Sequence, residues 1–194
     1  ETPSRIRVCV PDPRDLQFDL RIDVKGQTWQ LDYVHTGVPP AIAYVDHLER
    51  LDVAHWGPGI RHHPRFAPRG VNANFVEILA EGELAIRTYE FGVEAETLAC
   101  GTGSAAAAIV TTLQKQWPAA YRLGQKPVRV RVRGGETLCI WFVCENGNDV
   151  HDVCLETRVR ALYDGSFREE FLGEFKAGTT PGPAPASSRR MPRT

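Results

Sequence analysis

The chain has 194 residues, of which 42% are hydrophobic, and its formal net charge is −1 at pH 7. This length is enough for one well-packed domain. The balanced charge gives no electrostatic reason to expect nucleic acid or a membrane surface as a partner. No apolar run approaches the length of a transmembrane helix, and no secretory signal is visible.

The cysteines have no spacing typical of a disulfide framework. They are Cys9, Cys100, Cys139, Cys144 and Cys154. An odd number without regular spacing predicts reduced thiols, so we expect a cytoplasmic protein. The last three lie near His151, which raises the alternative of a zinc site. Because Cys139 and Cys144 are five residues apart in a strand-like stretch, they should face opposite sides, and we expect no metal.

The first part of the chain predicts strands joined by turns. Apolar and polar residues alternate over residues 6–10, 16–24 and 29–33, and a further strand is expected over 41–45. Between residues 46 and 63, apolar residues recur at near-helical spacing behind Asp52, a candidate N-cap. Gly57 and Pro58 predict that this helix is short or irregular.

The centre of the sequence combines two strands with a helix that is apolar on nearly every side. The strands are expected over residues 74–79 and 84–89, and the helix over 102–116, before Pro118. Six consecutive apolar residues, Ala105 to Val110, lie within it. A helix with such a sequence is a buried one.

Cys100 is expected at or just before the N-terminus of this helix. Gly101 and Gly103 allow a tight turn, and Thr102 or Ser104 is a candidate cap. Unpaired N–H groups and the helix dipole favour an anion there, so the sequence predicts a thiol with a lowered pKa that can act as a base or nucleophile. The same N–H groups could hold a substrate carboxylate. The alternative is that Cys100 is a small buried hydrophobic residue.

The carboxy-terminal part predicts further strands, over residues 128–132, 136–143, 153–163 and 165–171. Arg129, Arg131 and Arg133 share one face of the first of these. They could form a stripe that binds nucleic acid, but with a balanced net charge we favour the solvated outer face of a sheet. From Lys176 onward, the composition predicts a disordered tail over 176–194.

About nine strands with mostly antiparallel connections and one buried helix indicate the fold class α+β. We expect a mostly antiparallel sheet wrapped around the central helix, in a single domain over residues 5–175.

Several stretches of this chain resemble the diaminopimelate epimerase family. The family's second cysteine motif reads Glu96-Thr-Leu-Ala-Cys100-Gly-Thr-Gly-Ser-Ala-Ala here and is preceded by Arg87-Thr-Tyr-Glu90. Val71-Asn72-Ala73-Asn74-Phe75-Val76 and Gly57-Pro-Gly-Ile-Arg-His-His-Pro-Arg-Phe66 resemble the family's preceding segments. The similarity spans most of residues 6–171.

The resemblance implies a cofactor-free isomerase that inverts the α-carbon of the amino acid LL-diaminopimelate to give the meso form, in lysine biosynthesis. Two cysteines face each other across the substrate, and one takes the α-proton while the other returns one to the opposite face. Here Cys100 would be one of the pair, tuned by Glu90. Asn72 would hydrogen-bond the substrate, and the backbone N–H groups of Gly101 and Thr102 would bind its α-carboxylate.

The chain departs from the family in three respects. It resembles only the second of the family's two similar domains, so the partner cysteine would come from the absent amino-terminal domain or from a second chain. The family's Arg after the Glu90 position, which pairs with a substrate carboxylate, is Phe91. The family's Pro-His pair is Pro39-Pro40, and the Asn two residues before that histidine is Val38.

Three functions are therefore compatible with the sequence. The first is one half of an epimerase active site. The second is a family member that has lost catalysis and acts as a binding or structural module. The third is an unrelated anion-binding domain that uses residues 101–104, although the chain lacks a Gly-x-x-x-x-Gly-Lys-Ser/Thr motif for phosphate.

Overall fold

The computed structural model describes residues 4–145, 147, 149–159, 163–166 and 168. The strands are β1 (Ser4–Cys9), β2 (Arg14–Val24), β3 (Gln27–His35), β4 (Pro40–Tyr44), β5 (Asn72–Ala80), β6 (Glu83–Glu90), β7 (Ala95–Thr97), β8 (Val128–Val132), β9 (Thr137–Cys144) and β10 (Val150–Val159). The helices are α1 (Val53–Arg61), α2 (Gly101–Gln114) and the single turn α3 (Ala119–Arg122), with 3-10 turns at Leu48–Arg50 and Pro64–Phe66.

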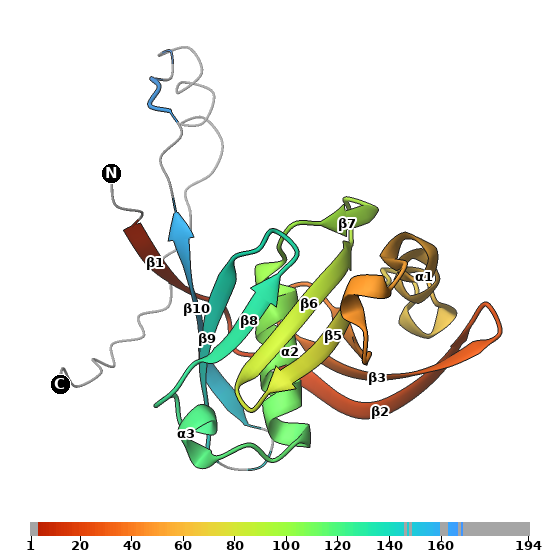
Figure 1. Cartoon of the computed structure of the whole chain (residues 1–194), viewed down its shortest axis with the longest axis horizontal. Helices are drawn as coiled ribbons and strands as arrows, with labels where there is room; N and C mark the ends of the chain where they lie inside the picture. Colours follow the sequence, from red (N-terminus) through yellow and green to blue (C-terminus); the bar gives the residue numbers. More distant parts are fainter. Residues whose placement is uncertain (1–3, 146, 148, 160–162, 167, 169–194) are drawn as a thin grey trace. The chain divides into compact units, whose positions relative to one another are not determined.

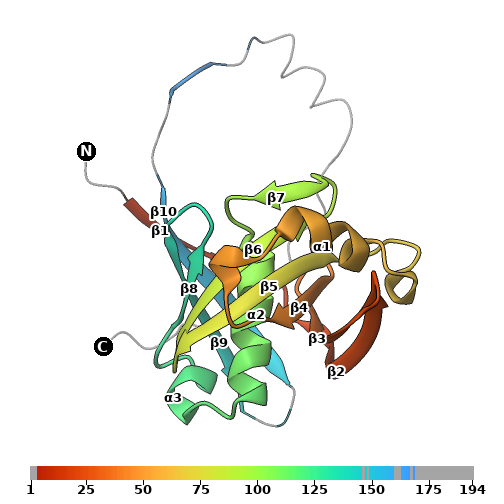
Figure 2. The same cartoon turned by 45° about the vertical axis from the view of Figure 1, so that its right-hand side comes forward.

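The ten described strands form one sheet in the order β1-β10-β9-β8-β6-β5-β4-β3-β2, and β7 pairs with β6 beside this path. Most pairs are antiparallel, and the parallel exceptions are β4 with β5 and β6 with β8. The sheet curves around α2, which lies behind β5 and β6 in Figure 1, with β9 and β10 on one side and β3 on the other. Figure 2 shows the same arrangement from a second direction. The expected sheet around a central helix is confirmed.

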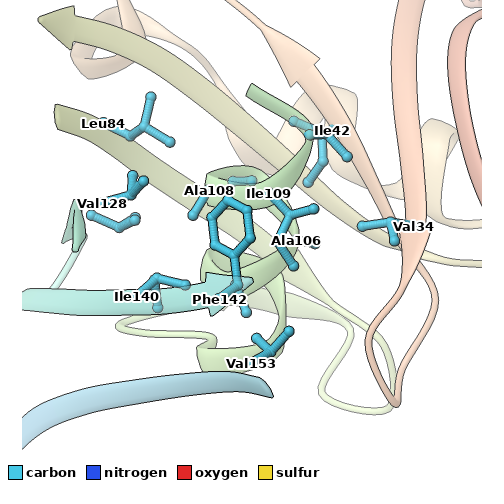
Figure 3. Packing of buried hydrophobic residues seen from close by; sticks show 14 of the residues in the cluster. Val34, Ile42, Leu84, Ala106, Ala108, Ile109, Val128, Ile140, Phe142 and Val153 are labelled. Atoms are coloured by element: carbon cyan, nitrogen blue, oxygen red, sulfur yellow. The ribbon is translucent and has the colours of Figure 1, made fainter. Parts of the chain in front are cut away.

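Helix α2 is surrounded by the larger of two hydrophobic cores. Its residues from Gly103 to Thr112 are all buried. Figure 3 shows Phe142 and Ile140 of β9 packed on the alanines of α2, with Ile42 and Val34 approaching from other strands. Small side chains on α2 let the strands approach closely from several directions, which explains why the predicted all-apolar helix is the centre of the fold.

A second core lies on the opposite face of the sheet, under α1. It contains Phe75, Leu31 and Trp29 from the strands and Val53 and Ile60 from the helix. Asp52 caps α1 as expected, because its side chain accepts a hydrogen bond from the backbone N–H of His55 at 2.9 Å.

Strand β2 contributes to both cores because it contains two irregularities, near Asp15 and Asp19. Both residues have positive φ angles, 58° and 57°, and the pairing with β3 shifts by one residue at each. As a result Phe18 packs on the core around α2, while Leu20 packs on the core under α1. Apolar and polar residues alternate along β2 as expected, but the apolar side chains point to both faces of the sheet.

The edge strand β1 is joined to β10 by a disulfide and by ion pairs, in addition to the backbone hydrogen bonds of the sheet. Cys9 and Cys154 are directly opposite one another and form a disulfide. Arg5 and Arg7 both pair with Glu156, at 2.8 and 3.0 Å. The expectation that all five cysteines are reduced is therefore wrong for this pair, which is 145 residues apart in sequence.

The arginines of β8 lie on its exposed face, as expected. Arg129 pairs with Glu83 at 3.6 Å, and Arg133, just beyond the strand, is 3.5 Å from Glu96. Among the described residues, no helix is long and apolar enough to cross a membrane.

The residues up to Val159 form one compact unit. Of the residues from 160 onward, the structure describes 163–166 and 168. The predicted tail over 176–194 lies outside the described residues. So does most of the strand expected over 165–171.

Candidate functional site

Cys100 is the N-cap residue of α2. Its backbone is extended (φ −130°, ψ 108°), and α2 begins at Gly101. The helix therefore starts one residue earlier than expected. No side chain caps it, and the hydroxyl of Ser104 instead donates to the carbonyl of Cys100 at 2.8 Å. The Cys100 side chain is at the mouth of the helix but is only 5% exposed.

The sulfur of Cys100 contacts two polar side chains. Nδ2 of Asn72 donates to Sγ at 3.6 Å, and Oγ1 of Thr102 lies 3.6 Å from the same atom. The structure thus brings together three of the residues that the sequence singled out, from β5 and from the first turn of α2.

Burial raises the pKa of the Cys100 thiol, and the negative charge of Glu90 raises it further. The hydroxyl of Thr102 and the backbone N–H groups of Gly103 and Thr102 lower it, but they do not compensate for burial. The lowered pKa expected from the helix N-terminus is therefore wrong. In this structure the resting group at neutral pH is the thiol.

Asn72 connects the sulfur to the end of β6. Its Oδ1 accepts the backbone N–H of Phe91 at 2.7 Å, while its Nδ2 points to Sγ. The residue is buried at the start of β5. Its amide is therefore fixed at both ends, and one Nδ2 hydrogen remains for a further acceptor.

Two further buried polar residues, which the sequence did not single out, support this arrangement. Asn74 donates to the carbonyls of Ala41 and Asn72, and its Oδ1 accepts the hydroxyl of Thr88 at 2.8 Å. A Cβ on Gly103 would collide with Oδ1 of Asn74 and lie 3.2 Å from the sulfur. The spacing Asn72-x-Asn74 in a strand was the available signal, because residues two apart share a face.

The three glutamates that precede Cys100 have different environments. Glu96 pairs with Arg87 at 2.6 Å, and Glu94 pairs with Arg61 at 3.0 Å. Glu90, at the end of β6, is the glutamate whose charge acts on the Cys100 thiol. This leaves Glu90 as the acidic group of the site.

Phe91 stacks on a buried guanidinium. The Cζ atom of Arg61, at the end of α1, lies 4.2 Å from the centre of the Phe91 ring. Arg61 also donates to the carbonyl of Arg69 and to Glu94. Phe91 therefore presents an aromatic ring with a positive charge behind it, where the sequence resemblance implies an arginine.

The turn between β3 and β4 forms another part of the surroundings. The hydroxyl of Thr36 donates to the carbonyl of Thr102 at 3.0 Å. The carbonyl of Pro39 accepts the backbone N–H of Asn72 at 2.8 Å. Val38 thus lies in a turn that contacts both α2 and β5, and Pro40 begins β4 opposite Asn72, but neither side chain offers a donor.

The other sulfurs belong to different parts of the fold. Cys144 is in the core around α2, Cys139 is on the opposite face of β9, and Cys154 is bonded to Cys9. Within the described residues, no three His, Cys, Asp or Glu side chains gather in a way that could hold a metal ion.

The chemistry available at Cys100 is proton transfer. A protonated sulfur beside amide and hydroxyl groups, at a helix N-terminus and shielded from water, can donate a proton to a carbanion held against it. The first N–H groups of α2 are suited to an adjacent carboxylate.

Comparisons with known proteins agree with this description. The model of the diaminopimelate epimerase family matches residues 33–151. Diaminopimelate epimerase of Chlorobaculum tepidum is 44% identical over 152 residues, which are 76% of this chain and 54% of that protein. The Aquifex aeolicus enzyme is 41% identical over 172 residues, which are 89% of this chain and 58% of that protein. The chain thus spans about half the length of these relatives.

Solved structures agree on the fold. A hydroxyproline epimerase from Agrobacterium vitis, solved with trans-4-hydroxy-L-proline, superimposes with a TM-score of 0.53 at 16% identity. The match covers 79% of this chain and 49% of that one.

Proposed function

Because this chain belongs to the diaminopimelate epimerase family, we propose that it takes part in the cofactor-independent inversion of LL-diaminopimelate to meso-diaminopimelate and supplies one of two thiols. The reaction is an isomerisation in lysine biosynthesis. We assign it to the cytoplasm on the family alone, because the disulfide between Cys9 and Cys154 removes the argument from reduced thiols. The observation that carries the proposal is the sulfur of Cys100. It is buried at the N-terminus of α2 and held 3.6 Å from both Asn72 and Thr102.

The raised pKa of Cys100 supports a specific role for this thiol. In the proposed step, an opposing thiolate takes the α-proton of the substrate, and the electron pair is delocalised into the α-carboxylate. The S–H of Cys100 then gives its proton to the other face of the α-carbon. Cys100 is left as the thiolate and the opposing sulfur as the thiol, so the reverse reaction uses Cys100 as the base.

The neighbouring residues have separate roles in this proposal. The N–H groups of Gly101 and Thr102 bind the α-carboxylate, as suits the first turn of a helix. Asn72 uses its free Nδ2 hydrogen for the substrate. Glu90 disfavours the thiolate of Cys100 through its charge, which keeps the sulfur protonated at rest and makes its thiolate a stronger base in the reverse reaction.

The opposing thiol has no candidate among the described residues. Cys139 faces away from α2, and Cys144 is enclosed in the core. We therefore propose that it comes from a domain like the amino-terminal half of the relatives, in the same polypeptide or in a second chain.

The second candidate function is a family member without catalysis that binds a ligand or a partner. It is favoured by the ring of Phe91, which stacks on Arg61 at 4.2 Å and offers no donor to a substrate carboxylate. A bidentate arginine at this position would contribute two charge-assisted hydrogen bonds.

A complementation experiment separates the two functions. The chain is incubated with LL-diaminopimelate in deuterated water, with and without the separately produced amino-terminal half of the Chlorobaculum tepidum enzyme. NMR follows the α-proton and the appearance of the meso form. We expect no inversion by the chain alone, because one thiol serves only one face. We expect meso-diaminopimelate labelled with deuterium in the mixture.

Two variants and one positive control define the result. Cys100→Ser should abolish the inversion, whereas Cys139→Ser should leave it unchanged. The carboxy-terminal half of the Chlorobaculum tepidum enzyme, in the same mixture, shows that complementation works. If that control is active and this chain is not, the non-catalytic function is favoured. Inversion by the chain alone would contradict the two-thiol proposal.

A further inference from the structure

We propose that a hollow between the Arg65–Arg69 loop and the β2–β3 hairpin binds a small carboxylate that carries an apolar or aromatic body. The hollow has a volume of about 620 Å³ and is lined by residues that pack on the α1 face of the sheet. Cys100 is not among its lining residues, although Pro39 and Val71 adjoin Asn72. This volume is in the range that small-molecule sites use.

One wall of the hollow is built by the irregular part of β2. The shift near Asp19 turns Gln17 toward the face that carries Tyr33, its partner on β3. Asp15, Gln17, Tyr33 and His35 therefore line the same side. A regular strand would have turned different residues to this wall.

The opposite wall is a loop that is held in one conformation. The N–H of Gly70 donates to the carbonyl of Phe66 at 2.7 Å, and the N–H of Val71 donates to the carbonyl of Arg61 at 3.1 Å. The buried guanidinium of Arg61 donates to the carbonyl of Arg69. Gly70 has a φ of +75° and no space for a Cβ against Arg61. Ordering this loop therefore costs a ligand little.

The loop brings two free cations to the hollow. The side chains of Arg65 and Arg69 are exposed, and within the described part of the chain neither has a carboxylate within 4.0 Å. His35 lies on the other side, and Asp15 is the acidic group of the lining. Two guanidinium groups on one rim favour a carboxylate, which they can bind with paired hydrogen bonds.

The interior of the hollow is suited to an apolar body. The rings of Tyr33 and Phe66 are stacked with their centres 6.4 Å apart and their planes 11° from parallel, and Leu20 lies beside them. Burial raises the pKa of Tyr33, and the negative charge of Asp15 contributes, so its hydroxyl stays protonated and available as a donor. A ligand that is only an anion would make no contact with these half-buried rings, whereas an apolar or aromatic body can pack against them.

The test is an NMR titration of the full 194-residue chain, with the Gly70 amide as reporter and three probes. Benzoate supplies charge and ring, benzamide supplies the ring without the charge, and inorganic phosphate supplies the charge without the ring. We expect saturable shifts with benzoate and much smaller shifts with the other two. Equal shifts with benzamide, equal shifts with phosphate, or no saturation with benzoate would overturn the proposal.

Charge variants locate the binding. Arg65→Gln and Arg69→Gln should each weaken benzoate binding by about fivefold, the value that corresponds to one ion pair of about 1 kcal/mol. Both side chains are exposed, so the fold should be retained. Arg21→Gln on β2, also exposed, is the matched control and should bind benzoate normally. A loss as large in Arg21→Gln would show a general charge effect and contradict the proposal.

Discussion

At the scale of single residues, burial and the helix N-terminus have opposite effects on the Cys100 thiol, and burial prevails. An exposed thiol at a helix N-terminus has backbone N–H groups to stabilise its anion. Cys100 has these groups too, but the strands of the sheet exclude water from it, and Glu90 adds a negative charge. Desolvation disfavours the thiolate more than the N–H groups favour it.

Glu90 is therefore expected to control the pH at which Cys100 reacts. In the native chain, alkylation of Cys100 by iodoacetamide should rise at a higher pH than alkylation of a free cysteine peptide. Glu90→Gln removes a charge that disfavours the thiolate, so it should move this rise to lower pH. Mass spectrometry of the modified residue across a pH series measures both.

Glu94→Gln serves as the control for this experiment. Glu94 pairs with Arg61 and His62, and its charge is not among those that act on the sulfur, so its replacement should leave the pH profile of Cys100 unchanged. A profile that does not move in Glu90→Gln, or that moves to higher pH, would show that the charge of Glu90 does not act on the sulfur.

At the scale of elements, the first turn of α2 is shaped by how closely β5 approaches it. Gly103 lies against Asn74, whose amide is fixed by bonds to Ala41, Asn72 and Thr88. Gly101 is less restricted, since a Cβ there would meet only the end of the Leu155 side chain, at 3.1 Å. A side chain at position 103 is therefore excluded by Asn74, whereas a side chain at position 101 is opposed only by a flexible leucine.

This difference predicts opposite results for two alanine substitutions. Alanine is favoured over glycine by about 1 kcal/mol in a helix interior, and since both positions lie in the first turn of α2 this value is an upper limit to the gain. At Gly103 the collision with the fixed Asn74 should outweigh this gain, because overpacking costs about 1–3 kcal/mol. Gly103→Ala should therefore lower the free energy of unfolding in urea, and Gly101→Ala should leave it equal or slightly higher. Equal stability of the two variants would argue against a rigid contact at Asn74.

The elements were predictable from sequence wherever a pattern extended over several residues. Alternation located the longer strands, and Asp52 was identified as the cap of α1. The three-residue strand β7 and the single turn α3 are too short to show a pattern. Strand β2 was expected to have one buried face, but its irregularities occur at aspartates rather than glycines, and nothing local marks them.

The candidate site was predictable to a similar degree. The sequence indicated Cys100 at a helix N-terminus with Gly101 and Thr102 beside it. The family resemblance added Asn72 and Glu90, and the roles of all these residues remain predictions. The direction of the Cys100 pKa could not be read from sequence, because it depends on how much water the strands exclude. Thr36 was missed because it is 66 residues from Thr102, whose carbonyl it contacts.

At the scale of the whole molecule, the amino-terminal strand β1 is one edge of the sheet. Among the described strands β1 pairs with β10 alone, and the disulfide between Cys9 and Cys154 joins residues 145 positions apart. When the chain unfolds, this disulfide still closes a loop that contains nearly all residues of the compact unit, so it reduces the conformational entropy of the unfolded state. The sequence did not suggest it, because distant cysteines in different strands have no recognisable spacing.

Reduction of this disulfide should destabilise the chain. Loss of a cross-link that closes so long a loop costs about 5 kcal/mol in the chain-entropy model, although the ion pairs of Arg5 and Arg7 remain. Dithiothreitol should lower the urea midpoint of the chain, and Cys9→Ser should lower it to the same value without reductant. Cys139→Ser is the control and should keep the response to reductant. A midpoint that is the same with and without dithiothreitol would contradict this role.

The irregularity at Asp19 has a consequence for which insertions and deletions the gene can tolerate. The backbone N–H of Asp19 donates to the buried carboxylate of Asp32 at 3.1 Å, which anchors the extra residue. Loss of that single codon would make β2 regular there and place Phe18 directly before Leu20, and because neighbouring residues of a regular strand point to opposite faces, the two side chains would keep their separate cores. The pairing of Gln17 with Tyr33 and of Leu20 with Leu31 would also be kept, and the loss would be the donor to Asp32. Deletion of a residue in a regular part of β2 would instead turn every residue beyond it to the other face, so deletions that natural variants tolerate in this strand should occur at this codon.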